Sequence, residues 1–263
     1  MATVGLLHPG EMGAALAGAL REREHDVLWA SSGRSEATRR RAESAGLTDV
    51  ATTKALAERS DVILSVCPPH AAREVARSSR GATGLFVDAN AIAPATVRAI
   101  AADRGSSNFV DGGIIGPPPR QSGTTRLYLS GSSAATVAEL FDGTPVDARV
   151  LSDRVGDASA VKLAYAAWTK GTAALLLAIR SVAEAEGVEE PLLEEWRLSL
   201  PELPETLVRA ARSADAKGWR WVGEMEEIAA MFAAAGLPDG FHRAAAETFG
   251  RASQLKRADR PAG

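Results

Sequence analysis

The segment VGLLHPGEMG, residues 4–13, leads from a short apolar run into a helical pattern. Gly10 would let the backbone approach a pyrophosphate, and Gly13 would let the following helix pack close to the strand. The amino end of that helix offers free N–H groups and the positive end of its dipole to an anion. His8 stands where the first glycine of a G-x-G-x-x-G motif would be. The segment therefore predicts a strand, a tight turn and a helix that bind a dinucleotide, although a turn without a ligand has the same pattern.

Short β-rich runs alternate with helical patterns through the first half of the chain. We expect strands at residues 3–7, 26–30, 61–67, 84–88 and 108–111, with weaker candidates at 126–130 and 148–151. We expect helices between them at residues 12–24, 36–45, 71–78 and 95–103. Several of the strands are almost wholly apolar, which is typical of a parallel sheet covered on both faces. The alternation predicts an α/β fold with a doubly wound parallel sheet of the Rossmann type.

The pattern changes near Ser152. Residues 153–186 contain no proline, and after Gly156 only one glycine, so we expect a single helix of about 30 residues. Residues 173–179 are apolar nearly all round, which requires burial on most sides. Helices should continue to the end, punctuated by Gly187, Pro191, Pro201, Pro204, Gly218, Gly236 and Pro238. We therefore predict a Rossmann domain over residues 1–152 and an all-α domain over residues 153–263 that forms a homodimer.

Composition excludes several classes of protein. The net charge of −3 gives no reason to expect nucleic acid as a partner. No apolar run approaches the roughly 20 residues that span a bilayer, and the amino terminus lacks the pattern of a signal peptide. Cys67 is the one cysteine, so no internal disulfide can form, and no Cys/His spacing suits zinc. We expect a soluble cytoplasmic protein without a metal that acts on a small molecule.

The residues after the second strand discriminate between cofactors. NAD sites place Asp or Glu there to bind the ribose 2′-hydroxyl. This chain has Ser31, Ser32 and Arg34 instead, and no carboxylate before Glu36. The serines can donate hydrogen bonds, and the guanidinium can pair with a 2′-phosphate. The segment favours NADP(H); the alternative is a solvated polar loop.

Four segments together resemble the β-hydroxyacid dehydrogenase superfamily, which includes 6-phosphogluconate dehydrogenase and the imine reductases. They are GLLHPGEMG at 5–13, DANAIAP at 88–94, DGGIIG at 111–116 and GDASAVK at 156–162. The first is similar to the superfamily's N-terminal turn and the second to its strand-end motif. The third stands at its substrate loop, and the fourth matches the start of its long helix. The segments are specific for the superfamily but not for a substrate.

The resemblance implies that Lys162 is the catalytic acid/base. The superfamily usually has asparagines three and four residues later, where this chain has Tyr165 and Ala166. Tyr165 falls on the same helical face as the lysine and is expected to orient the substrate or donate a proton. The serine of the substrate loop is also missing, with Ile115 in its place.

Further site residues are implied by position in the same motifs. The nucleotide would be bound by Gly10, Glu11, Met12 and Gly13 together with the serine–arginine segment, and the nicotinamide would be lined by Val66, Pro68 and Asn90. The substrate would meet Gly113, Ile114, Ile115, Gly116 and Glu224. Glu224 stands at an acidic position of the superfamily, within Trp219–Glu227, where the superfamily's lysine is absent. The alternative for that segment is a helix amino terminus stabilised by acidic side chains.

These features predict an NADP(H)-dependent oxidoreductase that acts on a small polar hydroxy or oxo compound such as a hydroxy acid. One alternative is an NADPH-dependent imine reductase, although retention of Lys162 counts against it because imine reductases usually lack this lysine. A second alternative is a non-catalytic NADP(H)-binding sensor or scaffold, which the missing asparagine and serine motivate.

Overall fold

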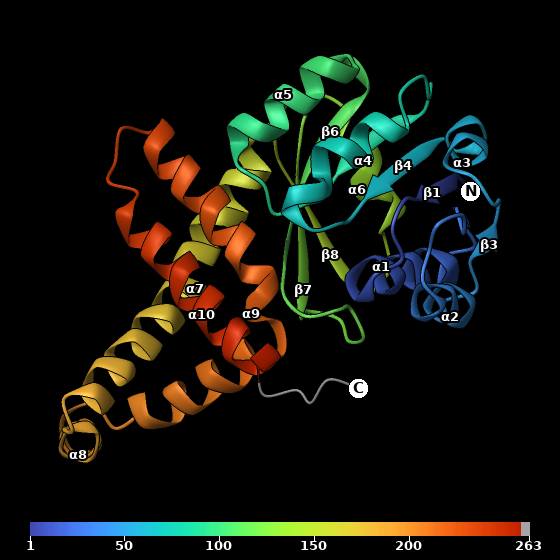
Figure 1. Cartoon of the computed structure of the whole chain (residues 1–263). Helices are drawn as coiled ribbons and strands as arrows, with labels where there is room; N and C mark the ends of the chain where they lie inside the picture. Colours follow the sequence, from blue (N-terminus) through green and yellow to red (C-terminus); the bar gives the residue numbers. More distant parts are fainter. Residues whose placement is uncertain (259–263) are drawn as a thin grey trace. The chain divides into compact units, whose positions relative to one another are not determined.

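The computed structural model describes residues 1–258. The chain divides into two compact units, Met1–Leu163 and the residues from Ala164 onward (Figure 1). The domain boundary expected at residues 152/153 falls just ahead of the long helix α7, Asp157–Ala185, and as a functional boundary it stays a prediction. Residues 259–263 of the expected second domain lie outside the described residues.

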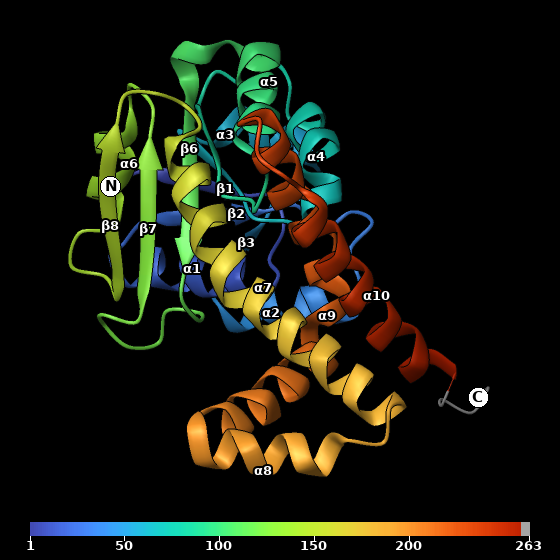
Figure 2. The ribbon, with the colours of Figure 1, turned by 90° about the vertical axis from the view of Figure 1, so that its left-hand side faces the viewer.

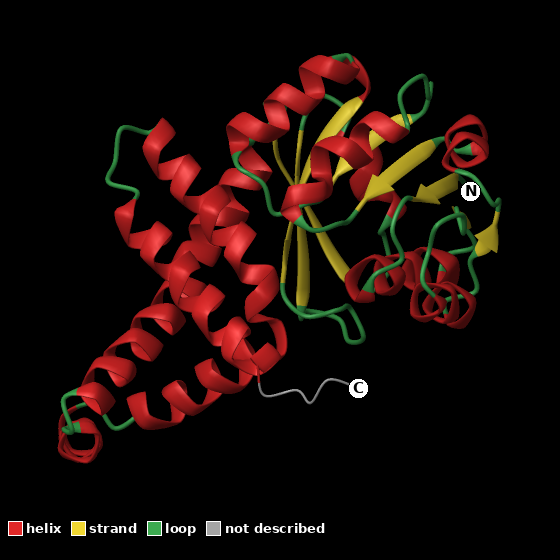
Figure 3. Ribbon diagram, in the orientation of Figure 1, coloured by secondary structure: helices red, strands yellow, loops and turns green. Residues whose placement is uncertain are grey.

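The first unit contains one eight-stranded sheet in the order β3-β2-β1-β4-β5-β6-β7-β8 (Figures 1 and 3). Every neighbouring pair is parallel except β6 and β7, which are antiparallel. This mostly parallel sheet confirms the predicted fold class. The strands are β1 Thr3–Leu6, β2 Asp26–Trp29, β3 Thr48–Asp49, β4 Val62–Ser65, β5 Leu85–Asp88, β6 Phe109–Ile115, β7 Thr125–Ser130 and β8 Val146–Ser152.

Helices cover both faces of the sheet, and the strands bury apolar side chains alternately on each side. Leu6 and Leu64 join one core with α1 (Glu11–Glu22), α2 (Glu36–Ser44) and α6 (Ala134–Leu140). Leu7 and Ile63 join the other core with α3 (Thr53–Arg59), α4 (Ala72–Ser78) and α5 (Pro94–Arg104). Short 3₁₀ turns occupy Pro69–Ala71 and Ser106–Asn108. The central strands β1, β4, β5 and β6 are thus buried on both faces, as the apolar strands predicted, whereas the outer strands β3 and β8 are partly exposed.

Three short elements and one strand end were missed. The strand β3 has two residues, and α3 and α6 have seven each, which is too short for a clear periodic pattern. The strand expected at 108–111 was too short, because β6 continues to Ile115 and pairs antiparallel with β7 over residues 111–115. The segment DGGII is therefore a buried strand, and the loop that was expected to contact a substrate begins only at Gly116.

The second unit is wholly helical among its described residues and confirms the single long helix, which has 29 residues. It continues with α8 (Glu189–Ser199), α9 (Leu203–Ala234) and α10 (Gly240–Ala258). Figure 2 shows α9 and α10 side by side. The interruption expected at Gly218 is wrong: α9 runs through it, because one glycine costs a helix only about 1 kcal/mol and packing can offset that. Pro191 and Pro204 lie in first helical turns, which tolerate proline.

Burial in this unit is uneven along α7. Leu176 packs with Trp196 of α8 and Leu207 of α9, but Leu175 remains 44% exposed. The expectation that residues 173–179 are buried on most sides is therefore not met within the described chain. None of the helices in the described part of the chain is both long and apolar enough to span a bilayer.

Candidate functional site

The turn between β1 and α1 is tight on one side and open on the other. Gly10 N–H donates to the carbonyl of His8 (2.9 Å), and Ala14 N–H begins the helical pattern by donating to Gly10 (2.9 Å). A Cβ on Gly13 would lie 2.6 Å from the carbonyl oxygen of His8, so only glycine fits. A Cβ on Gly10 would have no neighbour within 4 Å. The turn can therefore admit a ligand directly over the first N–H groups of α1.

His8, Arg34 and Cys67 gather where β1, β2 and β4 end. Burial and the nearby charge of Arg34 lower the pKa of His8 to about 4, so its imidazole is neutral at physiological pH. Burial lowers the pKa of the Arg34 guanidinium. Burial and the charge of Asp88 raise the pKa of the Cys67 thiol to about 12, which excludes it as a nucleophile. In the described residues, the buried His8 Nδ1 and Arg34 Nε have no hydrogen-bond partner, so the guanidinium has a donor, and the imidazole a ring nitrogen, that no protein group uses.

Polar contacts hold the segment after β2 in place. Ser31 is buried, and its N–H donates to Asp49 Oδ1 (3.2 Å). Arg39 Nη2 donates to the Ser31 carbonyl (3.1 Å), and Arg41 Nε donates to the carbonyl of Pro9 in the glycine turn (3.1 Å). Ser32 is exposed beside them. Hydrogen bonds from Ser31 and Ala51 keep the pKa of Asp49 below its ordinary value despite its desolvation.

Sequence reasoning missed Asp49, Arg39 and Arg41 at this edge. Asp49 belongs to the two-residue strand β3, which leaves no pattern in the sequence. The two arginines are i, i+2 on α2, and only the fold shows that both turn toward the strand ends. The edge is thus more basic than the sequence indicated.

Asn90 joins the ends of β4 and β5. Its Oδ1 accepts a hydrogen bond from Cys67 N–H (2.6 Å), and its Nδ2 donates to Ser65 Oγ (3.0 Å). The side chain is only 2% exposed, so both of its polar ends are used inside the protein. Val66 and Pro68, on either side of Cys67, are partly exposed. Asn90 therefore fixes the loop that was expected to line a nicotinamide.

Lys162 packs against β6 in the second turn of α7. A Cβ on Gly113 would lie 2.5 Å from the carbonyl oxygen of Ala158 and 3.0 Å from Lys162 Cβ. Gly112 is similarly close to Ala89, at the end of β5. Gly113 lies two residues past Asp111, which pairs with Asp88 at the end of β5. Lys162 therefore packs on the part of β6 that extends beyond the carboxyl end of β5.

Of the four residues proposed from the substrate loop, Gly113, Ile114 and Ile115 are buried in β6 and Gly116 is exposed. The backbone of Gly116 has φ +122°, and a Cβ there would meet the carbonyl oxygen of Thr124. Ile114 belongs to the sheet core. Only Gly116 of this set presents an open surface.

Tyr165 and Glu224 belong to the second unit. Tyr165 is 49% exposed, one turn after Lys162 on α7. Glu224 is buried in the interior of α9 and forms an ion pair with Lys170 of α7, whose Nζ lies 5.7 Å from the centre of the Trp221 ring. The alternative that Trp219–Glu227 begins a helix is therefore wrong. The positive charge that faces Glu224 comes from Lys170 on α7 and not from the segment itself.

Comparisons with known families match the two ends of the chain separately. Residues 3–91 match a family described as NADP oxidoreductase, coenzyme F420-dependent. Residues 183–252 match a domain of unknown function, DUF1932. An uncharacterized 28.5 kDa protein of Methanothermus fervidus is 31% identical over 194 residues, which cover 73% of this chain and 74% of that protein.

Solved structures extend the likeness over nearly the whole chain. A conserved protein of unknown function, described as structurally similar to 3-hydroxyacid dehydrogenases, is 28% identical with a TM-score of 0.68, over 98% of this chain and 100% of its own. This chain belongs to the β-hydroxyacid dehydrogenase-like superfamily as a divergent member. Mycobacterium tuberculosis 3-hydroxyisobutyrate dehydrogenase shares the superfamily fold at 16% identity, with a TM-score of 0.70 over 98% and 94% of the chains. An imine reductase of Streptomyces aurantiacus shares the fold at 18% identity, with a TM-score of 0.56 over 98% of this chain and 100% of its own.

The neighbours with a named activity are dehydrogenases and an imine reductase, and residues 3–91 match an NADP oxidoreductase family, so these comparisons point toward NAD(P)-dependent oxidoreduction. The first unit contains the glycine turn, the serine–arginine segment, the loop that Asn90 holds by hydrogen bonds, and Lys162. No cluster of metal-ligating side chains occurs in residues 1–258. The first unit thus contains both the open glycine turn, with basic side chains near it, and the lysine expected to be catalytic.

Proposed function

We propose that this protein is an NADP(H)-dependent oxidoreductase that acts on a small polar hydroxy or oxo compound, with Lys162 as its acid/base. The observation that carries the proposal is the contact of Lys162 with β6, just beyond the end of β5, in the unit that also contains the glycine turn. NADP(H), when bound, supplies or accepts the hydride.

The residues present fit a dinucleotide. The space over Gly10 is open, and the first N–H groups of α1 have no acceptor within the helix. The unpartnered atoms of His8 and Arg34 lie at the same edge. In this proposal the pyrophosphate lies over Gly10, Glu11, Met12 and Gly13. The 2′-phosphate meets Ser31, Ser32 and Arg34, and the nicotinamide lies against Val66, Pro68 and the loop that Asn90 holds.

Lys162 would handle the proton. Reduction of a carbonyl builds negative charge on its oxygen, and an ammonium within hydrogen-bond reach stabilises that charge and donates a proton. In the reverse direction, the neutral amine accepts the proton of the alcohol. Tyr165, one turn later, would orient the substrate. Further proposed substrate contacts are Gly113, Ile114, Ile115, Gly116 and Glu224, of which Gly116 alone is exposed.

The test uses Lys162→Ala with Lys54→Ala as its control, because Lys54 is an exposed helical lysine paired with Glu58. Purified protein is assayed with NADP⁺ and short 3-hydroxy acids, and with NADPH and the matching oxo acids. We expect Lys162→Ala to lower kcat by about 10²- to 10⁴-fold and to leave the dissociation constant of NADPH unchanged. Full kcat in this variant would remove Lys162 from the chemistry.

The same assay separates the alternatives. Turnover of cyclic imines with NADPH, without turnover of hydroxy or oxo acids, would identify an imine reductase. The fold likeness to a Streptomyces aurantiacus imine reductase keeps this alternative open. Tight NADPH binding, with no oxidation of NADPH by carbonyl or imine panels and no reduction of NADP⁺ by an alcohol panel, would identify a sensor.

We also propose that the protein is a cytoplasmic homodimer. Trp168, Leu175 and Val182 follow each other at seven-residue spacing on α7 and are 73%, 44% and 63% exposed. This heptad spacing suits packing against a second helix. Sedimentation of Trp168→Lys should show a shift to monomer, and an unchanged sedimentation coefficient would rule out this face.

A further inference from the structure

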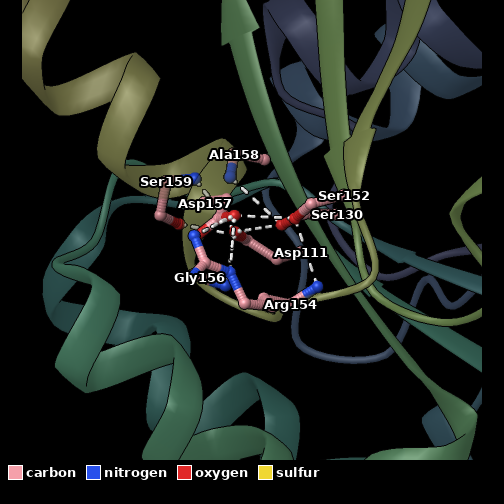
Figure 4. A network of polar contacts seen from close by, with 8 residues as sticks. All are labelled: Asp111, Ser130, Ser152, Arg154, Gly156, Asp157, Ala158 and Ser159. Atoms are coloured by element: carbon pink, nitrogen blue, oxygen red, sulfur yellow. Dashed lines mark hydrogen bonds and ion pairs between the residues drawn. The ribbon is translucent and has the colours of Figure 1, made fainter.

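A buried carboxylate on β6 collects hydrogen bonds from the start of α7. Asp111 is fully buried, and its Oδ2 accepts from Gly156 N–H (3.0 Å), Ser159 N–H (2.9 Å) and Ser130 Oγ (3.0 Å). Its Oδ1 accepts from Ser159 Oγ (2.6 Å). Ser130 in turn accepts from Ala158 N–H (3.1 Å). Figure 4 shows Gly156, Ser159 and Ser130 around the Asp111 carboxylate, with Ala158 bonded to Ser130.

The contact supplies what the beginning of a helix lacks. The first N–H groups of an α-helix have no acceptor within the helix, and a negative charge there also interacts well with the helix dipole. Asp111 satisfies two of these N–H groups directly, and a third through Ser130. Burial raises the pKa of Asp111, while the hydrogen bonds from Ser159, Ser130 and Gly156 oppose this rise by stabilising its ionised form.

The same strand fixes the next turn of the helix. Side chains alternate along a strand, so Asp111 and Gly113 face the same side of β6. Asp111 holds Gly156 and Ser159, and Gly113 touches Lys162 Cβ. Two points of one strand therefore define the position and rotation of the first two turns of α7.

We propose that Asp111 is the positioning residue for Lys162. It acts by holding the first turn of α7 in register with β6, and it does not itself touch a substrate. The inference rests on the proposed function only for the role of Lys162, because the hydrogen bonds that set its position are independent of that role. Displacing a catalytic group by about 1 Å can lower a rate about 100-fold.

Replacing Asp111 by asparagine is the sharpest perturbation. Asparagine keeps the size of the side chain, but one of its two polar ends becomes an NH₂ donor. The amide can keep its oxygen toward the two N–H groups of the helix and donate its NH₂ to the Ser159 hydroxyl, so the substitution mainly removes the negative charge that stabilises the beginning of α7. Asp157→Asn is the matched control, since Asp157 is also at the start of α7 but accepts from Ser152 and Arg154 rather than bonding to β6.

The experiment reads the position of Lys162 without a substrate. Lysines are reductively methylated with ¹³C-formaldehyde, and the Lys162 signal is assigned with Lys162→Arg. We expect Asp111→Asn to shift or broaden that signal and to speed amide exchange at Gly156 and Ser159 about tenfold or more. Asp157→Asn should leave the Lys162 signal unchanged. Ser159→Ala, which removes one donor and keeps the carboxylate, should act in the same direction as Asp111→Asn but less.

Unchanged signals and exchange in a folded Asp111→Asn protein would overturn the proposal. If that variant does not fold, an unchanged Lys162 signal in Ser159→Ala would overturn it instead. Once a substrate of the enzyme is known, Asp111→Asn should lower kcat on that substrate about 10- to 100-fold. The KM and the dissociation constant of NADPH should change little. Full kcat in Lys162→Ala, together with a displaced Lys162 signal in Asp111→Asn, would refute the proposed acid/base role of Lys162 and leave the positioning intact.

Discussion

Asp88 should make the protein less stable as the pH rises toward neutrality, and Asp88→Asn should remove this effect. Asp88 ends β5 with 1% exposure, and its Oδ1 accepts from Asn90 N–H (3.1 Å). Its Oδ2 is buried and, in the part of the chain that the structure describes, has no hydrogen-bond partner. The adjacent strand places the buried Asp111 at the paired position. Burial, reinforced by the charge of Asp111, raises the pKa of Asp88 to about 7.

The magnitude follows from linkage. The pKa of an aspartate is 3.8 in the unfolded chain and about 7 here, so between these values the folded state binds the extra proton. The free energy of unfolding therefore falls as the pH rises from about 4 to 7 and is level above 7. About three pKa units at 1.36 kcal/mol each give a loss of about 4 kcal/mol. The asparagine side chain introduced by Asp88→Asn cannot ionise, so the variant should lack this decline.

The assay is urea unfolding of wild type and Asp88→Asn at several pH values from about 4.5 to 8.5, a range that brackets the raised pKa. The buried amide can add a cost of about 1–3 kcal/mol that does not depend on pH. The quantity to compare is therefore how the difference in unfolding free energy between Asp88→Asn and wild type changes with pH. Between the lowest and the highest pH, this difference should move by several kcal/mol in favour of the variant. Asp142→Asn, at an exposed position, is the surface control. Parallel profiles for wild type and Asp88→Asn would refute the reasoning.

Three further predictions concern packing. Glu224→Gln removes the carboxylate charge that faces the largely buried Lys170 ammonium and should cost about 3–5 kcal/mol in denaturant unfolding. Lys170→Met in the same chain should recover much of this cost. Gly113→Ala should cost about 1–3 kcal/mol by the same method, because its Cβ would overlap the carbonyl of Ala158, and a cost near zero would mean that α7 can move away freely. The His242 ring packs against the Phe232 ring, with 4.4 Å between the ring centres, and burial lowers the pKa of His242 from 6.5. The unfolded chain therefore binds a proton more readily at this residue, so thermal stability should fall as the pH drops below 6.5. His242→Phe should show a shallower fall, and an equal fall would exclude His242 as the cause.

Local pattern was enough to predict the architecture. The glycine turn, the alternation of strands and helices and the long α7 each depend on residues close together in the sequence, and each was found. The features that were predicted wrongly depend instead on contacts between segments far apart in the sequence. The end of β6 is set by its pairing with β7, and the continuity of α9 through Gly218 is set by packing.

The site was predicted in its residue types but not in its contacts. Asp111 belongs to a motif that is visible in the sequence, yet its partners Gly156 and Ser159 lie 45 and 48 residues later. Lys170, the partner of Glu224, comes from another helix and is hidden for the same reason. Asn90 was assigned to the nicotinamide, whereas both ends of its side chain are bonded to β4 and the loop after it. Contacts between distant segments leave no periodic signal, so only the fold reveals them.

NADP(H) binding beside Arg34 is the central requirement of the proposed oxidoreductase function. The decisive measurement is the dissociation constant of NADPH and of NADH, followed by nicotinamide fluorescence, for wild type and Arg34→Ala. We predict that wild type binds NADPH at least about tenfold more tightly than NADH, and that Arg34→Ala loses about 10- to 100-fold for NADPH with little change for NADH. Equal or tighter binding of NADH by wild type, or no binding of either nucleotide, would contradict the account.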